Sequence, residues 1–121
     1  LAVELPPPNP DPRPEEWREW MAAGARGIRR AAHSRRDGAR LLIAWRPTPE
    51  RRARIYPANR ARLEASGFAP EDARVAFLAL GRYALGWAVT EQATDGPTPE
   101  TDADFESGLA AMLDGLALRR R

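Results

Sequence analysis

EDARVAFLALGRYALGWAVTEQ, residues 71–92, is the segment on which the fold of this chain depends, and from 75 to 89 its only charged side chain is Arg82. Pro70 suits the first position of a helix, and the two acids that follow it suit the positive end of the helix dipole. The segment therefore predicts a helix that is apolar on every side. Such a helix must be covered on several sides, so we expect a second copy of the chain, or a ligand, to help cover it.

The rest of the chain is predicted to be all-α, with about five helices and no β-pattern. Pro57 is expected to kink or split the third helix, and Gly67 is expected to end it in the left-handed conformation. Residues 93–103 are expected to form a polar loop. The expected helices span about 14–34, 38–43, 49–66, 71–92 and 104–119.

The composition suits a single domain over residues 1–121. The chain has no cysteine, which excludes disulfides and thiolate metal sites. No apolar run reaches the roughly 20 residues of a membrane span, and the first residues lack a signal-peptide pattern. We therefore expect a cytoplasmic protein with no membrane partner. The opening LAVEL resembles the end of a helix, so we expect a domain whose N-terminal neighbour is missing.

The charge is unevenly distributed between the two halves of the chain. Residues 1–62 hold fourteen arginines and seven acids, whereas residues 63–121 hold five arginines and ten acids. A basic half keeps direct nucleic-acid binding open as an alternative. No aromatic stacking motif or glycine-rich loop accompanies these arginines, and we expect the chain alone to bind duplex DNA weakly.

Catalytic chemistry has little support in the sequence. His33 is the only histidine, and it lies at a predicted helix end among arginines. No carboxylate cluster is near it in sequence, and no nucleophile elbow accompanies it. We therefore expect a surface histidine, no cofactor and no enzyme.

Several short motifs occur together in a recognisable order. They are RRDGAR at 35–40, Arg46-Pro47, Ser66-Gly67-Phe68, the helix through Gly86 that ends in Glu91-Gln92, and FESGLAAMLDGL at 105–116. Together they resemble the C-terminal domain of tetracycline-repressor-type (TetR) regulators. The resemblance implies a ligand-sensing and dimerising domain. Operator DNA would be bound only through a separate N-terminal helix-turn-helix domain, which this chain lacks.

The resemblance also implies an inducer pocket lined from several helices. An aromatic ring at a loop corner and an amide on an apolar helix side both suit ligand recognition, which favours Trp45 and Asn59. For Ile28, Leu42 and Phe77, ordinary core packing is an equally good interpretation. The matching positions are Gly24, Ile28, Leu42, Trp45, Arg46, Pro47, Asn59, Phe77 and Gly81.

Two positions depart from the members of that family that bind tetracycline. Leu42 stands where those members have the histidine that holds the drug's magnesium ion, and leucine cannot ligate a metal. Gly24 replaces an amide that grips the drug. Residues 93–103 also leave room only for a loop where those members carry an extra helix. We therefore expect no metal site and a small apolar inducer other than tetracycline.

A homodimer is expected from the residues themselves. The central helix presents Leu78, Leu85 and Val89 on one side, and the last helix presents a stripe of small residues. Small residues let two helix backbones approach closely, which increases dispersion contacts. We expect a four-helix bundle across a two-fold axis that buries roughly 2,000 Å² or more. The expected interface residues are Leu78, Leu85, Val89, Gly108, Ala111, Met112 and Gly115.

Three interpretations thus remain open at this stage. The first is the effector-binding and dimerisation domain of a repressor. The second is a dimerisation module whose pocket is filled by Trp45 and Phe77. The third is direct nucleic-acid binding by the arginine-rich first half, which would show a steep dependence on salt.

Overall fold

The computed structural model describes residues 16–44 and 48–120, without the side chains of residues 51, 52 and 55. These ranges contain helices and connections but no strand, so the all-α prediction is confirmed for them. Residues 14, 15 and 45–47, on which some predictions fall, lie outside the described part. The helices are α1 (Glu16–His33), α2 (Gly38–Ala44), α3 (Pro49–Ala65), α4 (Pro70–Ala93) and α5 (Pro99–Ala117).

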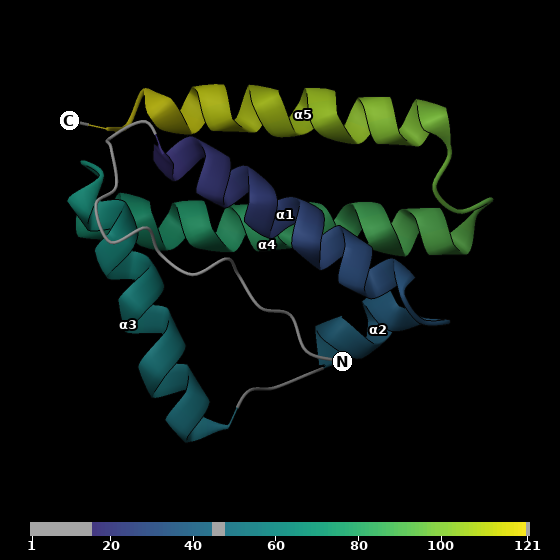
Figure 1. Cartoon of the computed structure of the whole chain (residues 1–121), viewed down its shortest axis with the longest axis horizontal. Coiled ribbons are helices and arrows are strands. Elements are labelled where there is room, and N and C mark those ends of the chain that lie inside the picture. Colours follow the sequence, from purple (N-terminus) through teal and green to yellow (C-terminus); the bar gives the residue numbers. More distant parts are fainter. Residues whose placement is uncertain (1–15, 45–47, 121) are drawn as a thin grey trace.

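The helix α4 is the centre of the arrangement (Figure 1). The figure shows α5 lying along α4 in the opposite direction, while α1 crosses α4 and α3 leaves the other helices at a steep angle. The short helix α2 packs against both α1 and α4. Consequently α4 touches every other helix, as its apolar sequence predicted.

One stripe of α4 is fully buried, and it consists almost entirely of alanine. The stripe recurs every three or four residues, which is the spacing of one helical face. Alanines let the backbone of α1 approach closely, and α1 supplies small buried residues of its own, including Gly24 and Ala25. The buried residues of α4 are Ala73, Ala76, Leu80, Ala84, Ala88 and Glu91.

Bulky side chains complete the core around this close crossing. Trp17, Trp20 and Met21 of α1 enter it, and Trp17 meets Phe68 edge-on at 5.0 Å between ring centroids. The helix α5 contributes Phe105, Leu109, Leu113 and Leu116. The other apolar sides of α4 are only half-buried, and Val75 is 38% exposed.

Two turns follow the sequence prediction. Gly67 ends α3 with φ of 106°, and Phe68 N donates to Leu63 O across the turn. Gly38 begins α2 where its backbone passes α1, and a Cβ there would lie 2.0 Å from Ala32 O. Only glycine fits this approach, so α2 is held directly against the end of α1.

The prediction for the start of α5 was wrong. The helix begins at Pro99, five residues before the predicted Asp104. Thr98 caps it, because its side chain accepts from Thr101 N while the Thr101 hydroxyl accepts from Thr98 N. The first turn buries no apolar side chain, so apolar periodicity could not detect it. Only residues 94–98 separate α4 from α5, and no extra helix lies between them, as predicted.

Pro57 does not split α3, contrary to one of the two predicted outcomes. The helix α3 continues through it from Pro49 to Ala65. Within the described ranges, no helix is long and apolar enough to cross a membrane.

Candidate functional site

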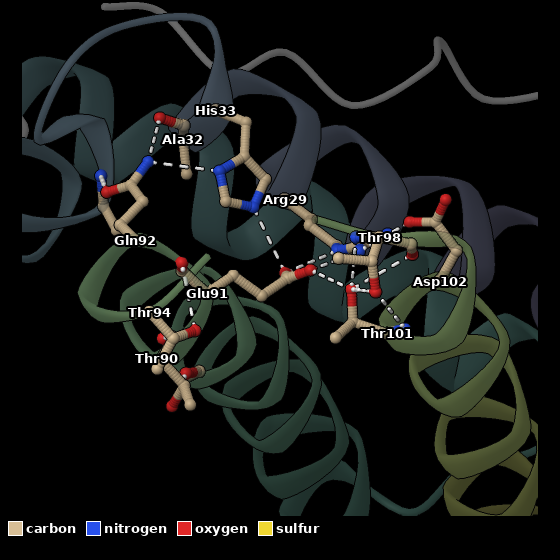
Figure 2. Close-up of polar contacts among 12 residues, drawn as sticks. Arg29, Ala32, His33, Thr90, Glu91, Gln92, Thr94, Thr98, Thr101 and Asp102 are labelled. Atoms are coloured by element: carbon tan, nitrogen blue, oxygen red, sulfur yellow. Dashed lines mark hydrogen bonds and ion pairs between the residues drawn. The ribbon is translucent and has the colours of Figure 1, made fainter. Parts of the chain in front are cut away.

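A buried carboxylate joins three helices at one end of the molecule (Figure 2). The Glu91 side chain, in the last turns of α4, is 2% exposed. Arg29 of α1 donates from Nε to Oε1 at 2.9 Å and from Nη2 to Oε2 at 2.6 Å. Thr101 of α5 donates its hydroxyl to Oε2 at 2.9 Å. Glu91 therefore fixes the positions of α1, α4 and α5 relative to one another.

The charges of this cluster support one another. Hydrogen bonds from Arg29, followed by those from His33 and Thr101, together lower the pKa of Glu91 from 4.5 to about 2, against the opposing effect of burial. Hydrogen bonding to Glu91 in turn raises the pKa of Arg29. Both groups are therefore ionised at neutral pH. A buried ion pair whose remaining donors and acceptors are satisfied is costly to break from one side.

His33 belongs to the same cluster, so the prediction of a surface histidine was wrong. Its side chain is 17% exposed, and its Nε2 lies 3.1 Å from Glu91 Oε1. Gln92 Nε2 lies 3.2 Å from the other ring nitrogen, Nδ1. Because an amide nitrogen can only donate, Nδ1 accepts and the Nε2 proton faces Glu91. The imidazole is thus oriented by two neighbouring residues of α4 that are distant in sequence.

Gln92 extends the cluster to the short helix α2. Its Nε2 donates to Ala32 O at 2.8 Å, and its Oε1 accepts from Ala39 N at 3.1 Å. The first turn of α2 and the last turn of α1 are therefore both tied to α4. These contacts hold backbone groups of α1 and α2 in place, which indicates a structural role.

Three arginines of α1 pair with acids of α5 in reverse order along the chain. Figure 2 shows the Arg29–Asp102 pair, whose Nη2–Oδ1 distance is 2.7 Å. The second and third pairs lie farther along the two helices and are more exposed. They are Arg26–Glu106 at 2.6 Å and Arg18–Asp114 at 2.6 Å. Together they tie α5 to α1 along most of its length.

The helix α3, in contrast, borders a groove. The groove lies between α3 and α4 and has a volume of about 310 Å³. Phe77 of α4 meets Tyr56 of α3 edge-on there, with ring centroids 5.9 Å apart. Binding pockets in proteins are typically about 300 Å³ or larger and mostly apolar. The groove is lined by Tyr56, Pro57, Arg60, Ala73, Arg74, Phe77 and Leu78.

The predicted ligand-binding residues are spread over four helices. Phe77 lines the groove, and Asn59 is half-buried on α3 one residue before the groove-lining Arg60. Gly81, one turn after Phe77, is half-buried, and a Cβ there would meet nothing within 4 Å. Trp45, Arg46 and Pro47 lie outside the described residues.

The remaining predicted ligand-binding residues lie within the packed part of the molecule. Gly24 is buried in α1, and Ile28 packs against the main core. Leu42 of α2 packs against Ala32, Ala39 and Ala88. The groove does not include these three residues.

The residues predicted for a dimer interface lie in two environments. On α4, Leu78 lines the groove, Val89 packs beside α2, and Leu85 is half-buried. On α5, Ala111 and Gly115 are exposed.

Two further predicted interface residues are engaged within the chain. Met112 packs against the core, and Gly108 faces the ring of Tyr83, whose Oη would lie 2.3 Å from an added Cβ. The Tyr83 hydroxyl donates to Phe105 O at 2.9 Å. Gly108 thus provides the space that lets Tyr83 lie between α4 and α5.

Sequence reasoning missed the groove residues on α3 and the partners of Glu91. Tyr56 and Arg60 are four residues apart, which places them on one helix face. Arg74 and Leu78 have the same spacing on α4. These spacings were available signals, but nothing in the sequence indicated that the two faces meet. The same holds for Glu91 and Arg29, which are 62 residues apart.

The fold of this chain has counterparts among known proteins. A family model described as the C-terminal domain of tetracycline repressor-like proteins matches residues 9–100. The chain therefore belongs to this family, as its motifs suggested. It is 30% identical to the class A tetracycline repressor protein from transposon 1721 of Escherichia coli, over 88% of this chain and 60% of that protein. It is 26% identical to the class C repressor of Escherichia coli, over 88% of this chain and 61% of that protein.

Solved structures agree with this assignment. A class A TetR in complex with 5a,6-anhydrotetracycline and magnesium superposes with a TM-score of 0.80 at 35% identity, over 93% of this chain and 65% of that one. A TetR variant from Acinetobacter baumannii AYE in complex with minocycline also gives 0.80, at 34% identity, over 97% of this chain and 64% of that one. The chain thus spans about three fifths of the class A and class C proteins. Those relatives are repressor proteins.

The donor set of the described residues does not suit the magnesium ion in the class A TetR structure. The described residues contain no group of three His, Cys, Asp or Glu side chains that could hold a metal ion. Leu42 offers no ligating atom and packs against alanines.

Proposed function

We propose that this chain is the effector-sensing and homodimerising domain of a tetracycline repressor-type transcription factor. A small apolar molecule would bind between α3 and α4, and a separate helix-turn-helix domain would bind operator DNA. The observation that carries the proposal is the apolar groove between these two helices, in a chain of this family. Phe77, predicted as a ligand contact, lines that groove.

The contacts of the helices suggest how binding would change the domain. Glu91, Gln92 and the α1–α5 ion pairs hold α1, α2, α4 and α5 together. The helix α3, in contrast, packs mainly against α4. A ligand that enters the groove would therefore tilt α3 relative to the other helices. It would shift the domain between two arrangements only if its affinity for them differs.

Neighbouring residues would complete the ligand site. Asn59 is half-buried beside the groove, and we propose that its amide gives the ligand a hydrogen bond. We further propose that Trp45 stacks on the ligand. Leu42 and Gly24 replace the groups that grip tetracycline and its magnesium in the family members that bind the drug. The effector would therefore be a different small apolar molecule.

A chimeric repressor tests the functional proposal. The part of the class A repressor that this chain does not match would be fused in front of it, and repression of a tetracycline-operator reporter would be measured. We expect repression that is relieved by a compound found to stabilise the isolated chain, and not relieved in the same chimera carrying Phe77→Ala. Repression that no stabilising compound relieves would contradict the effector role.

One observation favours a second candidate, a dimerisation module without a ligand. The edge-on contact between Tyr56 and Phe77 already fills part of the groove. In that case no compound would stabilise the chain in a thermal-shift screen, while the homodimer would persist.

A further inference from the structure

Two arginines stand out in the otherwise apolar lining of the groove. Arg60 lines it from α3 and Arg74 from α4, together with the Tyr56–Phe77 pair. A groove for a purely apolar ligand gains nothing from guanidinium groups, because charged groups prefer water or an opposite charge. Both side chains are more than half exposed, so they stand at the rim of the groove, where a charged group of a ligand could reach them.

The two arginines differ in how their charge is already balanced. Arg74 donates to Glu71 from both Nε, at 3.1 Å, and Nη2, in a two-pronged pair on the exposed side of α4. Arg60 is paired only with Glu64 among the described residues, and its Nε–Oε1 distance of 3.6 Å is too long for a hydrogen bond. The guanidinium of Arg60 therefore keeps its donors available at the groove.

The helix that carries Arg60 is itself basic. The sequence of α3 holds five arginines and two glutamates, a net charge of +3. Such a local excess raises the concentration of anions near the surface and favours their binding. Both the individual side chain and its helix therefore favour a negative ligand group.

We propose that the effector is an amphipathic organic acid. Its apolar, ring-containing body would lie against Tyr56 and Phe77, and its acid group would accept hydrogen bonds from Arg60. Guanidinium binds carboxylate-type oxygens through parallel hydrogen bonds, which gives orientation as well as affinity. This inference rests on the proposed function and refines it: the ligand of the same groove would be mainly apolar but would carry one acid group.

A pair of fluorescent probes with one ring system tests the acid group. Anilinonaphthalene sulfonate carries an anionic group, whereas N-phenyl-1-naphthylamine has the same rings without it. We expect the chain to bind the sulfonate more tightly. Arg60→Gln should weaken sulfonate binding by roughly fivefold, as expected for a partly exposed charge pair, and Arg60→Glu should weaken it further. Both variants should leave the Kd of the neutral probe unchanged.

Two controls separate this inference from the proposed function. Arg54→Gln removes an exposed arginine of α3 that does not line the groove, so it should leave the Kd of both probes nearly unchanged. Leu78→Trp, in a variant whose helical circular dichroism is intact, should fill the groove and weaken both probes.

The outcomes are distinguishable. Suppose first that Leu78→Trp weakens the binding of both probes, which shows that the groove is used. The acid group is then refuted if Arg60→Gln affects both probes equally, or if the wild-type chain binds the sulfonate no more tightly than the neutral probe. If Leu78→Trp leaves both unchanged, the groove assignment fails, and the proposed function with it. If neither probe binds the wild-type chain, both proposals are contradicted.

Discussion

Arg29 and Glu91 form a buried two-pronged ion pair, with distances of 2.9 and 2.6 Å, that joins α1 to the end of the central helix α4. Because Thr101 and His33 complete the coordination of the same carboxylate, the pair is part of a closed network. The network holds the end of α4 and the start of α5 together on either side of the five-residue connection, residues 94–98.

Glu91→Gln should strongly destabilise the domain. The change leaves Arg29 buried without its full counter-charge, and breaking a buried pair from one side typically costs about 3 kcal/mol or more. Urea unfolding followed by circular dichroism would measure it. The matched control is Glu71→Gln in the exposed Glu71–Arg74 pair, which should have no measurable effect. Equal effects of the two substitutions would show that the Glu91 network contributes nothing special.

Stability should depend on pH in the acid range through the same residue. The pKa of Glu91 is lowered from 4.5 to about 2 in the folded chain. A lowered pKa means that the unfolded state binds the proton first as pH falls, so the stabilisation is complete above about pH 5 and is lost towards pH 2. Unfolding free energies at several pH values should fall over this window, and more steeply for the wild type than for Glu91→Gln. Parallel pH profiles would contradict this.

Gly108→Ala should destabilise the packing between α4 and α5. The added methyl group would displace the Tyr83 hydroxyl, whose Oη would be 2.3 Å away, and weaken its hydrogen bond to Phe105 O. The expected cost is about 1–2 kcal/mol, offset in part by the better helix propensity of alanine. Tyr83→Phe removes the crowding atom, so the cost of Gly108→Ala should shrink in that background. A double-mutant cycle without coupling would refute this contact.

Ala111→Arg tests the proposed homodimer. Ala111 is exposed on α5, so the substitution should not disturb the fold of a single chain. In a close four-helix contact, however, it would insert a long charged side chain between two copies. Light scattering should show a dimer for the wild type and a monomer or aggregate for the variant. Ala103→Arg, at another exposed alanine of α5, is the control and should remain dimeric.

The helices of this domain could largely be predicted from local signals, because each signal lies within a few residues of the boundary it sets. Gly67 ended α3 as expected, and Pro70 began α4. The start of α5 was not predicted because Thr98 and Thr101 act through polar capping, whereas the prediction relied on the spacing of apolar residues. A capping box of two threonines is a weaker sequence signal than one with glutamate.

The groove and the Glu91 network could not be predicted, because they depend on which helix faces meet. Leu78 illustrates the limit. Its spacing placed it correctly on an incompletely buried side of α4, but the sequence did not tell whether α3 or a second copy would cover that side. Similarly, the position of His33 at a helix end was evident, while its neighbour Glu91 comes from a helix 58 residues away.

The most direct test of the proposed function is a crystal structure of the chain with a compound that stabilises it in a thermal-shift screen. We predict density for the compound between α3 and α4, in contact with Phe77 and within hydrogen-bonding reach of Arg60. A stabilising compound that binds elsewhere, with the α3–α4 groove unchanged, would contradict the account.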